Sequence, residues 1–232
     1  EVLVSRPEVL WKTDSQGQLL EPIERLFLET PQPYLGPVLE NLAFRKAEIV
    51  NMHHHVDQVS VEALIPMRGL IGFETDLVNL THGLGVVSHL FHEYGADRGE
   101  ILARKNGSLV SIENGVSTAY ALNLNQERGR LFVEPGDRIY KGMIVGENAR
   151  DNDIPINPCK IKHLTNMRSQ GDGKGIQLEP PLKMSLERAI EYIGSDEYVE
   201  ATPRNLRLRK KILDENQRKR AALSRATKMV VE

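Results

Sequence analysis

The spacing of apolar residues between positions 20 and 103 alternates between two periods. Two segments repeat every three or four residues, which is the period of a helix face; their apolar positions are Leu35, Val38, Leu39 and Leu42, and Leu70, Phe73, Leu77 and Leu80. The intervening runs are short or alternating and predict strands; they cover residues 26–28, 47–52, 59–65 and 86–91. We expect Gly83 to end the second helix. The order strand, helix, strand, strand, helix, strand predicts a ferredoxin-like split βαβ domain.

From residue 104 onward the pattern changes to short apolar runs separated by glycine and Asx turns. Strands are predicted at residues 109–112, 117–122, 131–133 and 143–147. Closely spaced turns of this kind indicate a small antiparallel barrel or sandwich.

The last part of the chain adds two predicted helices and two strands. Ser185 is placed to N-cap a helix with an apolar face between residues 186 and 193. Residues 214–225 contain good helix formers and almost no apolar stripe, so that helix would be solvated or laid on a polyanion. Strands are expected at residues 198–201 and 206–211. The fold class is therefore α+β: a ferredoxin-like domain, then a mostly β domain with one or two helices.

These patterns divide the chain into three parts. Residues 20–103 form the ferredoxin-like domain, and residues 104–232 form the mostly β domain with a long basic loop at 160–175. Residues 1–19 are interpreted as a linker or the remnant of a preceding domain. The chain does not begin with methionine and residues 1–5 look like a strand in need of a neighbour, so we expect further domains upstream.

Charge is distributed unevenly, although the net charge of the 232 residues is only −2. Residues 1–103 contain 7 lysines and arginines against 15 aspartates and glutamates, a net of −8. Residues 104–159 balance at 7 against 7, and residues 160–232 contain 16 against 10, a net of +6. A basic final third indicates an anionic partner, with nucleic acid as the first candidate.

Residues 160–175 are the strongest candidate for that contact. The segment combines four cations and three glycines with few apolar residues. It cannot bury enough apolar surface to offset its ordering entropy, and loops of this length are usually functional or disordered. Its cations are Lys160, Lys162, Arg168 and Lys174.

Further cations follow the segment in sequence. Strand alternation would place Arg207, Arg209 and Lys211 on one face. Arg218, Lys219 and Arg220 belong to the polar helix at 214–225. Guanidinium groups suit bidentate phosphate contacts, so we predict that these residues also bind RNA.

Motifs for catalysis and metal binding are weak. The run His53-His54-His55 lies where two strands should turn, and no carboxylate or cysteine stands at ligand spacing, so a hairpin tip is favoured over a metal site. Residues 171–175 (GDGKG) lack the order of a phosphate-binding loop. The single cysteine, Cys159, has no nucleophile signature and is interpreted as a small buried hydrophobe in a reducing compartment. No apolar run is long enough to span a bilayer.

Two other functional classes remain open on these observations. A metabolic enzyme would need titratable side chains converging in a cleft between the domains, and no motif supplies them. A protein-interaction module using a sheet edge of the acidic ferredoxin-like domain is the stronger alternative.

Several motifs carry a resemblance to known proteins. Residues 21–31, 35–38 and 45–47 resemble domain V of elongation factor G and related translational GTPases. A second set resembles the C-terminal half of the TypA/BipA family; it comprises residues 66–73, 106–111, 118–122, 126–129, 145–147, 164–168 and 184–187.

The resemblance implies the ribosome-binding part of a cytoplasmic translational GTPase linked to stress, cold growth and ribosome assembly. In that family, domain V approaches the stalk base of the large subunit, and the C-terminal domain carries a loop that reaches the acceptor end of A-site tRNA. The loop corresponds to residues 160–174, with Lys162, Thr165, Asn166 and Arg168 at matched positions. The GTPase domain, with its GTP and Mg, would lie upstream, so this chain is expected to be no enzyme. We also expect a monomer that contacts rRNA and no membrane.

Overall fold

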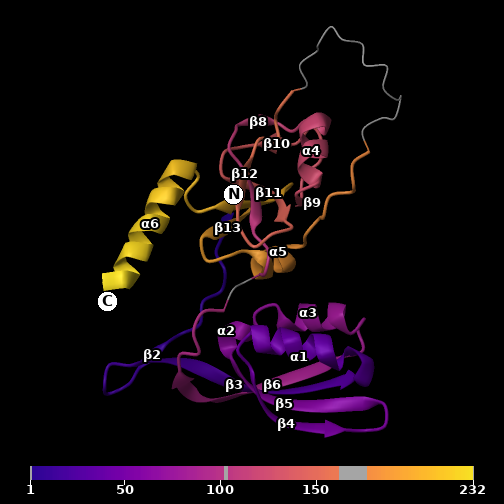
Figure 1. The fold of residues 1–232 in the computed structure, drawn as a ribbon, viewed down its shortest axis with the longest axis vertical. Helices are drawn as coiled ribbons and strands as arrows, with labels where there is room; N and C mark the ends of the chain where they lie inside the picture. The colour runs from indigo at the N-terminus through magenta and orange to yellow at the C-terminus, as the bar shows by residue number, and fades with distance from the viewer. Residues whose placement is uncertain (1, 102–103, 162–176, 232) are drawn as a thin grey trace. The chain divides into compact units, whose positions relative to one another are not determined.

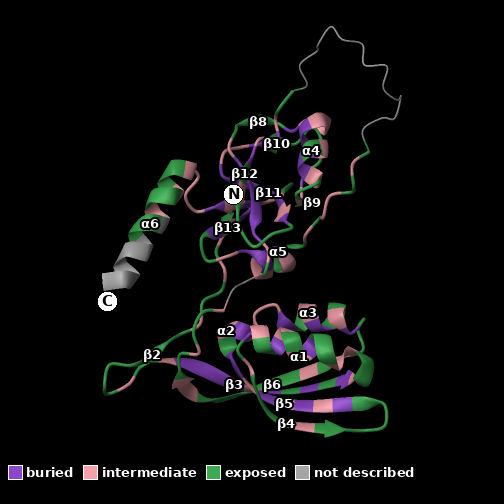
Figure 2. Cartoon of the chain, in the orientation of Figure 1, coloured by how far each residue is buried: buried purple, intermediate pink, exposed green. Residues whose placement is uncertain are grey.

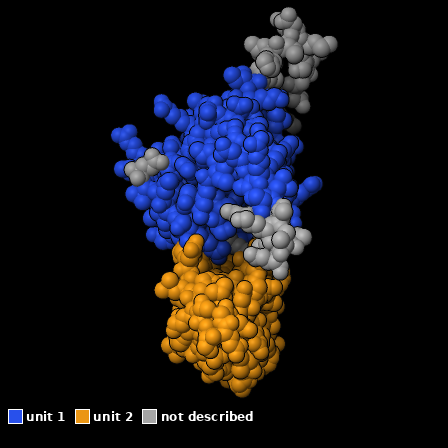
Figure 3. Space-filling model, turned by 90° about the vertical axis from the view of Figure 1, so that its left-hand side faces the viewer, with its two compact units in different colours: residues 1–6, 103–232 blue, residues 7–102 orange. Residues whose placement is uncertain are grey.

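The computed structural model describes residues 2–101, 104–161 and 177–231 (Figure 1). The chain divides into two compact units (Figure 3): unit 1 comprises residues 1–6 and 103–232, and unit 2 comprises residues 7–102. Each unit has its own hydrophobic core and is described by itself below.

Unit 2 is an antiparallel sheet with helices on one side (Figure 1). The four long strands lie in the order β4-β5-β3-β6, and the short β2 pairs with the start of β3. The strands are β2 (Lys12–Thr13), β3 (Leu19–Pro31), β4 (Glu48–His54), β5 (Gln58–Pro66) and β6 (Val86–Ala96). The helices are η1 (Gln32–Tyr34), α1 (Leu35–Phe44), α2 (Met67–Leu70) and α3 (Phe73–Leu80). Both the chain order and the sheet order are those of the ferredoxin-like fold, as the sequence predicted.

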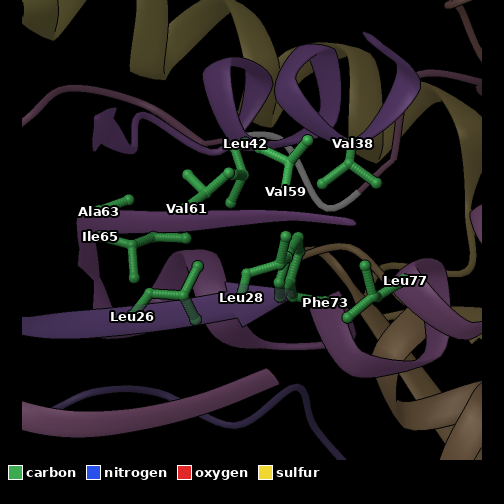
Figure 4. Close-up of a cluster of buried hydrophobic side chains, with 10 residues drawn as sticks. All are labelled: Leu26, Leu28, Val38, Leu42, Val59, Val61, Ala63, Ile65, Phe73 and Leu77. Carbon is green, nitrogen blue, oxygen red and sulfur yellow. The ribbon is translucent and has the colours of Figure 1, made fainter. Parts of the chain in front are cut away.

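The core of unit 2 forms because alternate residues of β3 and β5 face the helices (Figure 4). Figure 2 shows the alternation as buried and less buried positions along β5. The buried side chains are Leu26, Leu28, Val38, Leu42, Val59, Val61, Ala63, Ile65, Phe73 and Leu77.

Of three local predictions for unit 2, one is wrong and two are confirmed. The second helical stripe is not one helix, because Ile71 has an extended ψ of 115° and Gly72 has a φ of +73°, which separates α2 from α3. Gly83 follows α3 with a φ of +80°, as expected for a residue that ends a helix. The three histidines lie at a hairpin as predicted: β4 ends at His54, and the His55 N–H donates to the Gln58 carbonyl at 2.8 Å.

Unit 1 contains a mixed sheet in the order β1-β13-β14-β11-β7-β12, with β9 also paired to β11. Its strands are β1 (Val2–Val4), β7 (Ser108–Ser111), β9 (Gly129–Leu131), β11 (Met143–Asn148), β12 (Ile154–Ile156), β13 (Glu197–Ala201) and β14 (Leu206–Lys210). A separate pair consists of β8 (Gly115–Val116) and β10 (Arg138–Ile139). The helices are α4 (Ala119–Gln126), α5 (Leu186–Tyr192) and α6 (Glu215–Val231).

This sheet is buried on both faces, since neighbouring residues of β7 and β11 belong to different cores. Leu109 and Val145 pack with Leu122 of α4, whereas Val110 and Ile144 pack in a second cluster with α5. The strands described here leave the sheet open, so the closed barrel that turn spacing allowed is not formed. The strand β1 finds its neighbour in β13 of the same unit.

The prediction of a strand at residues 117–122 is wrong, because this stretch begins helix α4. The Thr118 hydroxyl accepts a hydrogen bond from the Ala121 N–H at 3.1 Å, which caps the helix start. Ala121, Leu122 and Asn125 then fall on one buried face at helical spacing.

Candidate nucleic-acid interface

Helix α4 fixes the chain at both ends of the basic segment. At its N-terminus, the Thr118 hydroxyl donates to the carbonyl of Lys160 at 2.6 Å, and the Thr118 N–H donates to the carbonyl of Pro158 at 3.0 Å. One residue therefore caps the helix and holds the outgoing chain. Lys160 itself is exposed at this point.

At the C-terminus of α4, the Gln126 side chain holds the returning chain. Its amide NH₂ donates to the Gln177 carbonyl at 3.0 Å, and its amide oxygen accepts from the Glu179 N–H at 3.2 Å. A helix of eight residues is about 12 Å long, so the segment leaves and returns at points set by that length.

Five of the predicted contact residues cannot be placed on this frame. Residues 162–176 lie outside the described part of the chain. They include Lys162, Thr165, Asn166, Arg168 and Lys174, whose roles stay predictions.

The predicted basic face of β14 exists in part. Arg207 and Arg209 are half-buried and alternate with the buried Leu208, while Lys211 follows directly after the strand. Arg207 is held by the Glu200 carboxylate at 3.2 Å, and the Lys211 Nζ lies 5.0 Å from the centre of the Tyr198 ring. No ion pair within the described residues engages Arg209.

Glu200 also accepts a hydrogen bond from the Tyr140 hydroxyl at 2.6 Å. Burial, followed by that hydrogen bond, raises the pKa of the Tyr140 hydroxyl above its ordinary value. The phenol is therefore a neutral donor near pH 7, and Glu200 is shared between Tyr140 and Arg207.

The structure also contains a buried cation that the sequence analysis did not select. Lys210 is only 3% exposed, and its Nζ lies 2.6 Å from Asp153, 2.9 Å from Asp196 and 2.8 Å from Glu197. The fully buried Glu197 is also bound by Arg104, through two nitrogen–oxygen distances of 2.7 Å. Burial alone would lower the pKa of the Lys210 ammonium, but these carboxylates, with Glu197 foremost, raise it, so the lysine stays charged. Lys210 is therefore part of the scaffold.

Three of the predicted cations gather around a hollow of about 520 Å³ beside the start of α6. Lys211, Arg218 and Lys219 all line it. Arg218 donates to the carbonyls of Ile212 and Leu213, and Lys219 pairs with Glu215 at 2.6 Å. Arg220 is exposed and forms no ion pair with any described residue.

Several exposed arginines of unit 1 were missed from the sequence. They share an exposed position and the lack of a carboxylate within ion-pair distance among the described residues; they are Arg128, Arg130, Arg138, Arg150 and Arg204. The even balance of charge in residues 104–159 concealed the four of these arginines that lie there. Within that stretch Asp153 pairs with Lys210 and Glu147 accepts a hydrogen bond from Asn106, so neither carboxylate pairs with them. Arg128 lies two residues beyond α4, and its carbonyl accepts from the Ala149 N–H, next to Arg150.

The described residues offer no cluster of metal ligands and no activated thiol. They contain no group of three or more His, Cys, Asp or Glu side chains arranged to hold a metal ion. Burial, with a smaller effect of Glu113, raises the pKa of the Cys159 thiol, which makes it a poor nucleophile. Nor is any helix in this part of the chain both long and apolar enough to cross a bilayer.

Comparisons with known proteins agree with the division into two units. A family model described as the elongation factor G C-terminus matches residues 18–105, and one described as the TypA/BipA C-terminal domain matches residues 106–215.

Three similar proteins carry the name "Large ribosomal subunit assembly factor BipA". The protein from Bacillus subtilis is 42% identical over 229 residues, which are 98% of this chain and 37% of that protein. Those from Synechocystis and Haemophilus influenzae are 44% and 43% identical, over 90% and 95% of this chain and 35% and 36% of theirs. The chain thus spans little more than a third of the length of these relatives.

The ferredoxin-like fold and the first family match define unit 2 as a C-terminal domain of the kind found in translational GTPases. The second match specifies the family. The chain belongs to the TypA/BipA family, and unit 1 contains that family's C-terminal domain.

Proposed function

We propose that this chain is the ribosome-binding part of a translational GTPase and that unit 1 contacts rRNA of the large ribosomal subunit. The names of the similar BipA proteins, which describe large-subunit assembly factors, support a role in assembly of that subunit. The charge of unit 1 supports RNA as its partner, since it contains 24 lysines and arginines against 18 aspartates and glutamates.

The second part of the proposal concerns the segment at residues 160–175. It contacts the acceptor end of A-site tRNA through Lys162, Thr165, Asn166 and Arg168, with Lys160 and Lys174 adding charge. The observation that carries this role is the anchoring of residues 160 and 177–179 to the two ends of α4. Fixed ends limit the ordering entropy that a loop loses when it binds, which favours contact at a defined place.

The remaining proposals concern the whole protein. It hydrolyses GTP, and it binds GTP and Mg in a domain outside this chain. The nucleotide site is assigned to another domain because the sequence here has no G-x-x-x-x-G-K-[ST] loop. It acts in the cytoplasm as a monomer, with unit 2 approaching the stalk base, and contributes to the stress and cold response.

A paired charge removal tests the tRNA contact. We expect Lys162→Ala with Arg168→Ala to weaken binding to an RNA minihelix ending in an unpaired CCA by about tenfold or more, because two phosphate contacts are lost. The measurement is a fluorescence anisotropy titration with the minihelix.

The matched control is Lys183→Ala with Arg188→Ala, which removes the same charge from two cations that pair with Glu134 and Glu191. If both double variants bind the minihelix as tightly as the unaltered chain, the segment has no role in tRNA binding.

A further inference from the structure

Unit 2 contains a groove that the proposed RNA contacts do not use. Its volume is about 570 Å³. It is lined by the chain that precedes β2 and by residues of β3, α2 and β6. Its apolar lining includes Leu10, Met67, Leu70 and Phe91.

The groove leaves large apolar side chains in water. Leu10 is 83% exposed, Phe91 is 59% exposed and Met67 is 44% exposed. Apolar residues gathered in a concave surface mark a binding site more often than scattered ones do. Because their burial would be favourable and this unit does not bury them, a partner with apolar side chains fits the groove.

The charge around the groove identifies the class of that partner. Two carboxylates line it, the exposed Glu8 and the buried Glu24, whose carboxylate contacts the His89 ring, and no lysine or arginine does. Lys12 lies at the rim, with its Nζ 3.9 Å from the centre of the Tyr94 ring. Residues 7–102 contain 6 lysines and arginines against 14 aspartates and glutamates.

Most of those few cations are already occupied within unit 2. Arg45 pairs with Asp76 at 2.7 Å, Arg68 with Glu21 at 2.5 Å, and Arg98 with Glu48 at 3.2 Å. A nucleic-acid backbone would therefore meet net negative charge, whereas a basic polypeptide would meet complementary charge.

Strand β6 offers a way to hold an extended polypeptide beside the groove. Among the described strands it pairs only with β3, so one edge of β6 keeps unpaired main-chain donors and acceptors. An exposed edge of this kind can accept an added strand, while pockets alongside select the side chains.

We propose that this groove and the free edge of β6 bind an extended, basic segment of a protein. Apolar side chains of the segment fill the groove, and its lysines or arginines face Glu8 and the acidic surface of unit 2. If the chain binds the large subunit, as proposed above, the segment belongs to one of that particle's basic proteins.

The single tryptophan provides a direct test. Trp11 directly follows Leu10, the last residue of the segment that lines the groove, and the sequence contains no other tryptophan. A short peptide that alternates lysine with leucine is expected to bind and change Trp11 fluorescence, while the matching glutamate–leucine peptide is not. Phe91→Ala and Glu8→Lys should each weaken lysine–leucine binding by about tenfold, as expected for a central apolar anchor and a facing charge.

The control is Phe27→Ala, which removes a phenylalanine of similar exposure (41%) from β3 outside the groove lining. It should leave binding unchanged, and all three variants should keep the melting temperature of the unaltered chain within a few degrees. Failure of the lysine–leucine peptide to bind, or equal binding by all variants, would overturn the proposal.

Purified large subunits separate this proposal from the proposed function. We expect Phe91→Ala to weaken binding to intact subunits and to leave binding to their protein-free rRNA unchanged. An equal loss on both would contradict a protein partner. If the chain binds the peptide but does not bind large subunits, the proposed ribosome binding is refuted and the groove assignment is retained.

Discussion

At the scale of single residues, two adjacent lysines in unit 1 have opposite roles. Lys210 is enclosed by three carboxylates, and Lys211 lies over the Tyr198 ring at the rim of a hollow. Lys210 is the last residue of β14, whereas Lys211 follows the strand, and the two side chains lie in different surroundings. Only one of the two cations is available to an anionic partner.

Neutralising Glu197 is expected to destabilise unit 1. The substitution Glu197→Gln leaves the Arg104 and Lys210 charges largely buried with their central carboxylate removed. Breaking a buried ion pair from one side costs about 3–5 kcal/mol, to be measured as the free energy of unfolding in urea. As a control, Asp196→Asn alters a half-exposed carboxylate that also contacts Lys210. Equal effects of the two substitutions would argue against Glu197 as the centre of the cluster.

The same carboxylate makes stability depend on pH. Burial would raise the pKa of Glu197, but the hydrogen bonds and charge of Arg104 lower it to about 2. A lowered pKa means that the stabilisation is complete above the unfolded pKa of about 4.3 and is lost as the pH falls toward 2. The free energy of unfolding measured in urea should decline by up to about 3 kcal/mol over that pH interval. This part of the decline should be missing from Glu197→Gln; a curve of unchanged shape would contradict the assignment.

At the scale of elements, helix α4 is the frame of the candidate interface. Thr118 and Gln126 lie just before it and at its end, and they hold residues 160 and 177–179 respectively. The helix packs through Leu122 into a core of the mixed sheet, so the frame is continuous with the body of unit 1.

Releasing one of these anchors should weaken RNA binding more than stability. Gln126→Ala removes the contacts to Gln177 and Glu179, which are exposed. Exposed hydrogen bonds contribute about 1 kcal/mol each or less, whereas freeing one end of the segment raises the entropy lost on binding. We expect a several-fold weaker minihelix affinity with a nearly unchanged melting temperature. If the substitution lowers the melting temperature and leaves the minihelix affinity unchanged, Gln126 has only a structural role.

The ferredoxin-like unit was predictable because its apolar positions follow two clear periods. Val59, Val61 and Ala63 alternate in β5, and Val38 with Leu42 marks one face of α1. Helix α4 was not predictable in this way. The segment at residues 117–122 is short and contains both β-branched and apolar residues, so its sequence pattern does not distinguish a strand from a helix. The Thr118 cap and the burial of Leu122 in the folded unit determine that it is helical.

The candidate interface was predictable only as a distribution of charge. Sequence identifies where cations are dense, but it does not identify which of them have carboxylate partners. Arg207 has Glu200 and Lys210 has three acidic neighbours, whereas Arg128 and Arg150 have none within ion-pair distance among the described residues. These pairings join residues of different strands and loops, so they become visible only in the folded unit.

At the scale of the whole molecule, the two units differ in the sign of their charge. Unit 2 has a net charge of −8 and unit 1 a net charge of +6. We assign RNA to the basic unit and a basic protein segment to the groove of the acidic unit. A particle made of RNA and basic proteins offers both kinds of partner.

The most direct test of this account is cosedimentation of the chain with purified large ribosomal subunits over a series of salt concentrations. Each phosphate contact contributes a slope of about −0.7 to −0.9 to the logarithm of the binding constant against that of the salt concentration. We predict measurable binding at low salt that weakens linearly on this plot, with a slope equivalent to several contacts. Absence of binding at low salt, or an affinity that does not change with salt, would contradict the central claim.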